Sequence, residues 1–101
     1  LTFTTAAFPV HINWSAGVEN DTSGSDVSIN IDVDGANELG TGGINGQYQA
    51  GTPRPFTIGH DTAALTAAPH TIKMRWRVSA NTGTIVANTT SAASFSAHEL
   101  R

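Results

Sequence analysis

The sequence contains no cysteine, few charged side chains and no long apolar run. The absence of cysteine excludes disulfide bonds, thiolate chemistry and cysteine-ligated zinc sites. Charged residues make up 13% of the 101 residues, against about 25% in a typical soluble domain, and the net charge is -3. Because a nucleic-acid surface needs a broad basic patch, the sequence predicts no nucleic-acid partner.

No stretch approaches the roughly 20 consecutive apolar residues of a membrane helix, so the sequence predicts no membrane span. A length of 101 residues predicts a single domain over residues 1–101 with its own core. Because the chain begins at Leu1 rather than at methionine, a fragment of a longer chain is the alternative. A small domain without disulfides needs another stabiliser if it is secreted, and oligomerisation is the expected one.

The strongest pattern is an uninterrupted alternation of large apolar and long cationic side chains over residues 70–79. Such alternation predicts a strand with one buried face. The apolar set comprises Ile72, Met74, Trp76 and Val78, and the cationic set comprises Lys73, Arg75 and Arg77. Because the apolar set is expected in the core, replacement of Trp76 with alanine is expected to cost about 3–5 kcal/mol.

Alternation with period two recurs along the chain, whereas no helical period persists over ten residues. Turn signals separate the alternating segments, among them the Asp34-Gly35 hairpin dipeptide. Residues 40–55, rich in glycine, proline and amides, predict a long excursion with little regular structure. The expected strands are 2–5, 8–14, 26–34, 55–59, a weak one around Leu65, 70–79, 84–87 and 93–98. Six to eight such strands predict an all-β fold, an antiparallel β-sandwich or barrel.

Residues 32–38 superficially resemble a calcium loop, because acidic and amide oxygens alternate before a glycine. The glycine comes two residues too early for the full motif, and the terminal bidentate acid is missing. The pattern therefore favours a strand that ends in an Asp-Gly turn, with a weak calcium site near Asp32 and Asp34 as the alternative. The histidines occupy separate segments without ligand spacing and predict no metal site; they are His11, His60, His70 and His98.

The sequence also lacks the local signatures of catalysis. No Gly-x-Ser-x-Gly elbow is present, and the glycine-rich segment 40–46 departs from the dinucleotide-binding fingerprint at Asn45. We therefore expect no catalytic residue, no cofactor and no enzymatic activity.

The acidic face of strand 26–34 can oppose the basic face of strand 70–79. Asp32 or Asp34 would then lie near Lys73, Arg75 or Arg77. The pairing is expected within one subunit, where it would fix the register of the sheet. Pairing between subunits, where it would fix an assembly, is the alternative.

The last third of the chain carries a resemblance to a known family. His70-Thr71-Ile72-Lys73-Met74-Arg75-Trp76-Arg77, the Gly83-Thr84 turn and the ending Phe95-Ser96-Ala97-His98-Glu99-Leu100 resemble the closing strands of small jelly-roll domains in bacteriophage virion surface proteins. The chain departs from that pattern at Ala68-Pro69, usually Gly-Thr, and at His98, usually aliphatic. The resemblance implies a jelly-roll sandwich, trimer formation and a place on the virion surface.

Three functions follow from the residues and the resemblance together. The leading hypothesis is a non-enzymatic capsid decoration or cement module, expected to be a homotrimer that contacts the major capsid protein or other virion proteins. The second is the receptor-binding head of a tail fibre or spike, which would contact host-surface saccharide through residues 40–55. The third is a carbohydrate-binding β-sandwich module. The candidate contact residues are Gln47, Tyr48, Gln49, Arg54, Lys73, Arg75 and Arg77.

Overall fold

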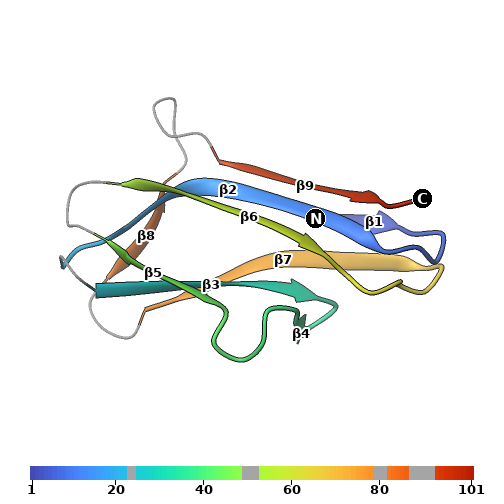
Figure 1. The fold of residues 1–101 in the computed structure, drawn as a ribbon, viewed down its shortest axis with the longest axis horizontal. Coiled ribbons are helices and arrows are strands. Elements are labelled where there is room, and N and C mark those ends of the chain that lie inside the picture. Colours follow the sequence, from blue (N-terminus) through green and yellow to red (C-terminus); the bar gives the residue numbers. More distant parts are fainter. Residues whose placement is uncertain (23–24, 49–52, 79–81, 87–92) are drawn as a thin grey trace.

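The computed structural model describes residues 1–22, 25–48, 53–78, 82–86 and 93–101. These residues form two antiparallel sheets that pack face to face in an elongated body of 44 × 30 × 16 Å (Figure 1). The strands are β1 (Thr2–Thr4), β2 (Val10–Asn20), β3 (Ser25–Val33), β4 (Ala36–Asn37), β5 (Ile44–Tyr48), β6 (Arg54–Asp61), β7 (Pro69–Arg77), β8 (Gly83–Val86) and β9 (Ser94–Glu99). The predicted all-β sandwich is therefore confirmed.

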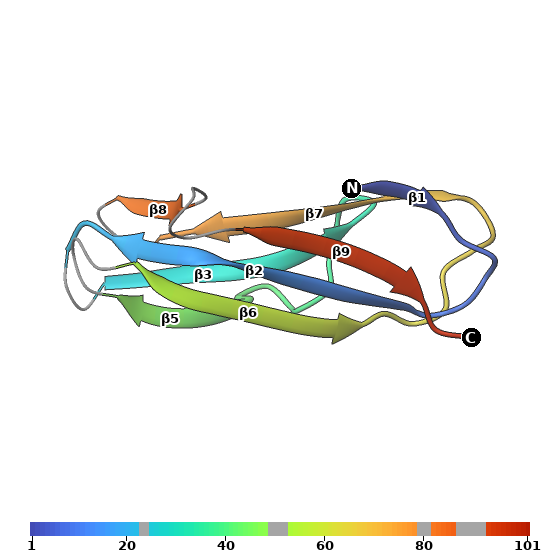
Figure 2. The same ribbon diagram turned by 90° about the horizontal axis from the view of Figure 1, so that it is seen from above.

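The strand pairing gives the sandwich its topology. In one sheet β7 lies between β1 and β3, and β3 carries β4 and β5 one after the other on its far side. Figure 2 shows β5 on the opposite side of β3 from β7. In the second sheet β2 lies between β6 and a row formed by β8 and β9. If β4 and β5 are counted as one interrupted strand, and β8 and β9 as another, the two sheets contain seven strands. Their pairing order is that of the last seven strands of an eight-stranded jelly roll. The fold is jelly-roll-like.

Most expected strands are present, with three corrections. The long excursion predicted over 40–55 contains β5, which pairs with β3 from Ser25 to Ile29. The weak strand predicted around Leu65 is a connection without strand structure. The described residues hold nine strands rather than six to eight, because β4 and β5 both form beside β3. Weak alternation misled the prediction at these places. β5 forms although its own sequence alternates little, because it pairs with the strongly patterned β3.

The Asp34-Gly35 hairpin turn was predicted correctly. Asp34 and Gly35 both adopt positive φ, at 52° and 94°, and join the paired residues Val33 and Ala36. Two central residues with positive φ define the turn whose twist matches that of a hairpin. The turn thus joins β3 directly to β4.

The core lies between the sheets and comes mainly from the two central strands. Alternate side chains of β2 and β3 point inward, as period-two patterning requires. The buried apolar residues are Val10, Ile12, Trp14, Ala16, Val18, Val27, Ile29, Ile31, Val33, Ile58 and Ile72. The described residues contain no helix long and apolar enough to cross a bilayer.

The predicted burial of the apolar face of β7 is only partly correct. Ile72 is buried, and Met74 and Val78 are partly buried against the core. Trp76, in contrast, is 47% exposed. The reason is its place in the sheet: β1 covers β7 only as far as Ile72, and Trp76 lies beyond that cover at the flank of the sandwich.

Candidate functional site

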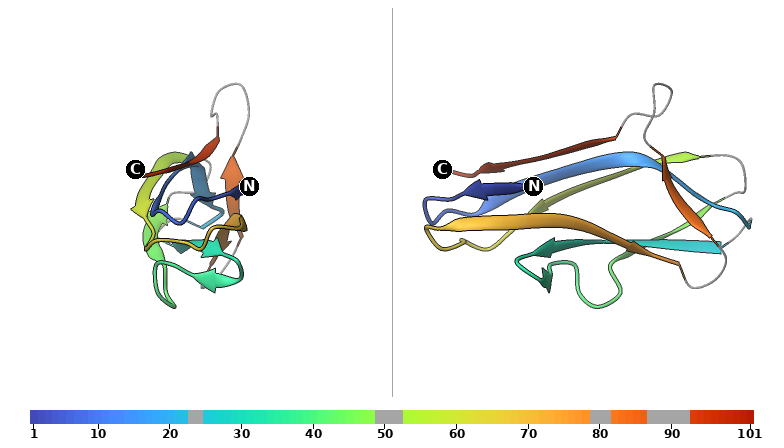
Figure 3. Two further views of the ribbon diagram at one scale, coloured as in Figure 1. Left: turned by 90° about the vertical axis from the view of Figure 1, so that its right-hand side faces the viewer. Right: turned by 180° about the vertical axis from the view of Figure 1, so that it is seen from behind.

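One end of the sandwich is built from two connections that are far apart in sequence. Residues 5–9 link β1 to β2, and residues 62–68 link β6 to β7 (Figure 3, left). The Thr5 N–H donates to the Ala68 carbonyl at 3.1 Å, and the Leu65 N–H donates to the Phe8 carbonyl at 3.3 Å. We call residues 5–9 and 62–68, together with Leu100, the alanine end.

The alanine end is apolar and carries no charged side chain in either connection. Phe8 is 39% exposed, and Leu100, whose N–H donates to the Pro9 carbonyl at 2.8 Å, is 37% exposed. The exposed alanines are Ala6, Ala7, Ala63, Ala64 and Ala67. Exposed apolar side chains gathered at one end of a polar domain are typical of a protein–protein contact.

The backbone of the alanine end is held in one shape by short-range and long-range bonds. The Thr62 hydroxyl accepts the Val10 N–H at 3.1 Å and donates to the Ala63 carbonyl at 2.6 Å. The Thr5 hydroxyl donates to the Thr66 carbonyl. Ala7 adopts a φ of 68°, a left-handed conformation that costs roughly 1–2 kcal/mol for a residue with a Cβ. These bonds therefore fix the backbone shape of the alanine end within the domain itself.

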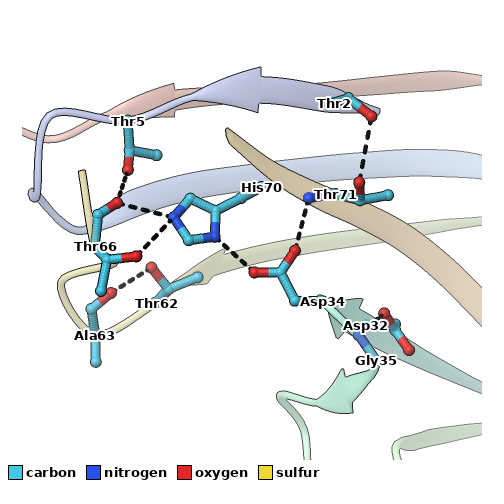
Figure 4. A network of polar contacts seen from close by, with 10 residues as sticks. All are labelled: Thr2, Thr5, Asp32, Asp34, Gly35, Thr62, Ala63, Thr66, His70 and Thr71. Atoms are coloured by element: carbon cyan, nitrogen blue, oxygen red, sulfur yellow. Dashed lines mark hydrogen bonds and ion pairs between the residues drawn. The ribbon is translucent and has the colours of Figure 1, made fainter. Parts of the chain in front are cut away.

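A buried histidine ties the alanine end to the hairpin turn after β3 (Figure 4). The His70 ring places Nδ1 at 2.6 Å from the Asp34 carboxylate and Nε2 at 2.8 Å from the Thr66 carbonyl oxygen. The second oxygen of Asp34 accepts the Thr71 N–H at 2.8 Å. We call Thr66, His70 and Asp34 the histidine clamp.

The pKa of His70 is raised and the pKa of Asp34 is lowered, and both directions favour a clamp in which the two side chains are charged. The hydrogen bond to Asp34 raises the pKa of His70 above its ordinary value, and the bond to the Thr66 carbonyl adds to this effect. The hydrogen bond from His70 lowers the pKa of Asp34, and the Thr71 N–H lowers it further. Both effects favour an imidazolium that donates from both ring nitrogens.

The order threonine, histidine and aspartate superficially matches a nucleophilic triad, and the Thr66 hydroxyl lies 3.4 Å from His70 Nε2. A general base must offer a free nitrogen lone pair to the nucleophile. Here the Nε2–H faces the Thr66 carbonyl oxygen at shorter range and donates a hydrogen bond to it. The geometry therefore suits a structural clamp rather than activation of a hydroxyl.

The clamp predicts a pH dependence of stability. Because the folded pKa of His70 is raised above its ordinary 6.5, its contribution is complete below that value and is lost as pH rises through the folded pKa. Because the folded pKa of Asp34 is lowered below 3.8, its contribution is present above 3.8 and is lost as pH falls through the folded pKa. Urea unfolding between about pH 3 and about pH 9 measures both losses.

The matched control is His70→Gln, which keeps polar atoms but does not titrate. We expect the alkaline loss of stability to shrink in this variant relative to the unsubstituted protein. Equal pH dependence in the two proteins would contradict a titrating clamp. Direct titration of the His70 ring signal by NMR gives the same answer independently.

Two of the other three histidines, His11 and His60, also contact carboxylates, a grouping that the sequence spacing did not predict. His11 contacts Asp61, and the rings of His11 and His98 lie 5.2 Å apart across the β2–β9 pair. His60 Nε2 lies 3.1 Å from Glu38. Within the described ranges, no group of three or more histidine or acidic side chains is placed to hold a metal ion.

The predicted pairing of acidic and basic strands occurs within one chain. Asp32 lies opposite Lys73 in the β3–β7 register, and its carboxylate forms an ion pair with Arg75. Asp32 is only 2% exposed, and its other oxygen accepts the Gly35 N–H at 2.8 Å. The expected pairing within one subunit is therefore confirmed. Asp32 and Asp34 both hold protein partners, so these carboxylates fix the β3–β7 register and the hairpin turn.

The predicted contact residues that the structure describes belong to three strands in the two sheets. Gln47 and Tyr48 belong to β5, Arg54 begins β6 in the other sheet, and Gln49 lies outside the described residues. Lys73, Arg75 and Arg77 lie on the outward face of β7, where Arg77 pairs in register with Ser28. Contact by any of these residues with a partner stays a prediction.

Sequence reasoning missed the alanine end and the histidine clamp. The repeated Ala-Ala pairs at 63–64 and 67–68 were the available signal for an apolar connection. No local signal connected His70 with Asp34, which lies 36 residues earlier. Comparison with known protein families, curated proteins and solved structures found no match to the chain.

Proposed function

We propose that this domain is a non-enzymatic structural protein of a bacteriophage virion, a capsid decoration or cement module that works as a homotrimer. The alanine end is its assembly surface. It contacts neighbouring copies and the major capsid protein, so that the module binds across capsid subunits and stabilises the shell.

The observation that carries the proposal is the alanine end itself. An apolar centre with a polar and charged rim is the usual anatomy of a protein interface. Here the rim includes Arg101, whose guanidinium lies 5.3 Å from the centre of the Phe8 ring, and Glu99, which accepts the Ala6 N–H at 2.9 Å. The histidine clamp supports the same role, because the hydrogen bond from His70 to the Thr66 carbonyl fixes the position of the connection 62–68.

Two further features support the virion assignment. The sheet topology is jelly-roll-like, and the closing strands resemble those of virion surface domains. A jelly roll hosts many functions, so the assembly surface rather than the fold selects a structural role over a catalytic one.

Insertion of a charge into the alanine end tests the assembly surface. We expect the protein to elute at trimer mass in size-exclusion chromatography with light scattering. Ala64→Asp should weaken association by at least about a hundredfold, because a buried unpaired carboxylate costs several kcal/mol. Ala93→Asp, at an exposed alanine just before β9, is the matched control and should leave the mass unchanged.

Two outcomes would contradict the proposal. The unsubstituted protein could stay monomeric at high concentration, or Ala64→Asp could assemble as well as Ala93→Asp does. Far-UV circular dichroism of both variants establishes that each is folded, so a loss of assembly is not confused with unfolding.

The second candidate function is the receptor-binding head of a tail fibre or spike. The amide, aromatic and cationic residues of 47–54 favour it, because such side chains suit contact with saccharide. Gold-labelled antibody against the domain, applied to phage particles that carry it, separates the two. Gold over the head supports decoration, and gold at the tail tip supports receptor binding.

A further inference from the structure

The edge of β7 is paired over only part of its length. β1 pairs with Pro69–Thr71, and Leu1 exchanges two backbone bonds with Ile72, at 3.0 and 2.7 Å. Beyond Ile72, none of the described strands pairs with this side of β7 as far as Arg77, and Figure 2 shows β7 extending past β1. Backbone bonds of an antiparallel strand alternate between its two neighbours. The N–H and C=O groups of Met74 and Trp76 therefore point to the open side.

The side chains along this open edge differ between the two faces of the sheet. On the inner face, Trp76 is 47% exposed and Met74 is partly buried. On the outer face, Lys73 and Arg77 are exposed and have no ion pair among the described residues, whereas Arg75 is held by Asp32. The open edge thus offers apolar contact on one face and two free positive charges on the other.

The charges decide which kind of strand fits. Two copies paired edge to edge and centred on Arg75 would place Lys73 of one copy opposite Arg77 of the other. Like charges directly opposite are destabilising, and cationic edge strands are a known protection against self-pairing. An added strand with acidic side chains at the outward positions is instead attracted by the positive charges of Lys73 and Arg77.

We propose that the open edge of β7, from Lys73 to Arg77, binds an extended acidic peptide of a partner protein as an added strand. The peptide backbone bonds to Met74 and Trp76. Its outward acidic side chains face Lys73 and Arg77, and its inward apolar side chains cover Trp76. Strand addition of this kind draws affinity from main-chain bonds and specificity from alternate side chains. The edge is separate from the alanine end, so this binding does not depend on the virion role.

The test compares two peptides whose termini are both blocked. The acidic peptide is Glu-Val-Glu-Val-Glu-Val-Glu, and the basic control is Lys-Val-Lys-Val-Lys-Val-Lys. Binding is measured by calorimetry and by the change in Trp76 fluorescence, and NMR locates it through the amide signals of Met74 and Trp76. We expect the acidic peptide to bind at least about tenfold more tightly than the basic one. The variant Lys73→Glu with Arg77→Glu should reverse this preference, and both positions are exposed, so the fold is retained.

A second comparison tests the added strand itself. N-methylation of the peptide on alternate residues removes the N–H donors of one edge only. We expect one methylation pattern to abolish binding and the other to preserve it, since a strand uses one edge. Trp76→Phe should remove the fluorescence change while calorimetry still reports binding, because Trp14 is buried.

Four results would overturn the proposal. The two peptides could bind equally, both methylated peptides could retain affinity, or the amide shifts could fall at the alanine end instead of β7. A shift of the Trp76 signal with protein concentration alone would assign the edge to a second copy of the chain and would also overturn it.

Discussion

Ile12→Ala is expected to lower the free energy of unfolding by about 4 kcal/mol, because it removes a fully buried side chain from the central strand of a sheet. Ile12 pairs with His60 of β6 on one side and with Ala97 of β9 on the other, so neither neighbour can move in to fill the space. For a domain of this size, a loss of this magnitude lowers the melting temperature by about 15–30 °C. Urea unfolding at constant pH measures it.

Trp76→Ala is the matched control for the core substitution. It removes a larger side chain than Ile12→Ala does, yet Trp76 is 47% exposed and lies outside the packed core. We expect a cost of about 1 kcal/mol, well below the value that its sequence pattern predicts. If Trp76→Ala were more destabilising than Ile12→Ala, the assignment of Trp76 to the open flank would be wrong.

Gly43→Ala is expected to destabilise the protein by about 3 kcal/mol, through two independent effects. Gly43 adopts a φ of 66°, in the left-handed region that residues with a Cβ avoid. A Cβ at this position would also overlap the backbone carbonyl oxygen of Ile29, which cannot move without disturbing β3. Gly43 directly precedes β5, so the substitution is also expected to loosen the pairing of Ile44 with Ile29.

The neighbouring Gly42→Ala provides the control, because a Cβ there meets no atom within 4 Å and φ is not in the left-handed region. We expect it to be neutral or to stabilise by about 0.5 kcal/mol, since alanine restricts the unfolded chain. Equal destabilisation by the two substitutions would show that the chain before β5 does not approach β3 closely. Chemical denaturation of both variants separates the two outcomes.

The strands that the sequence predicted well are those whose inward face is apolar at every second residue. Residues 26–34 and 70–79 are examples, and the Asp34-Gly35 turn was found because it depends on only two residues. β5 was missed because its sequence, Ile-Asn-Gly-Gln-Tyr, has little alternation. Its strand structure comes from pairing with β3, a contact between residues roughly twenty positions apart along the chain.

The candidate site was predicted only where two patterned strands meet. The pairing of Asp32 with Arg75 followed from two charged faces that could be identified on the sequence. The contact of His70 with Asp34 could not be predicted from the sequence, because the local pattern around each residue indicates only the end of a strand. The alanine end likewise combines two connections that no sequence pattern relates.

The sequence by itself determined the strongly alternating strands, their inward faces and the all-β fold class, because these depend on the alternation of neighbouring side chains. The tertiary structure alone decided which strand edges are covered, and therefore that Ile72 is buried whereas Trp76 is half exposed. It also brought residues 5–9 beside residues 62–68 and placed His70 between Thr66 and Asp34. Burial at an edge and contact across a connection depend on the neighbouring strand, and no local pattern along the chain specifies that neighbour.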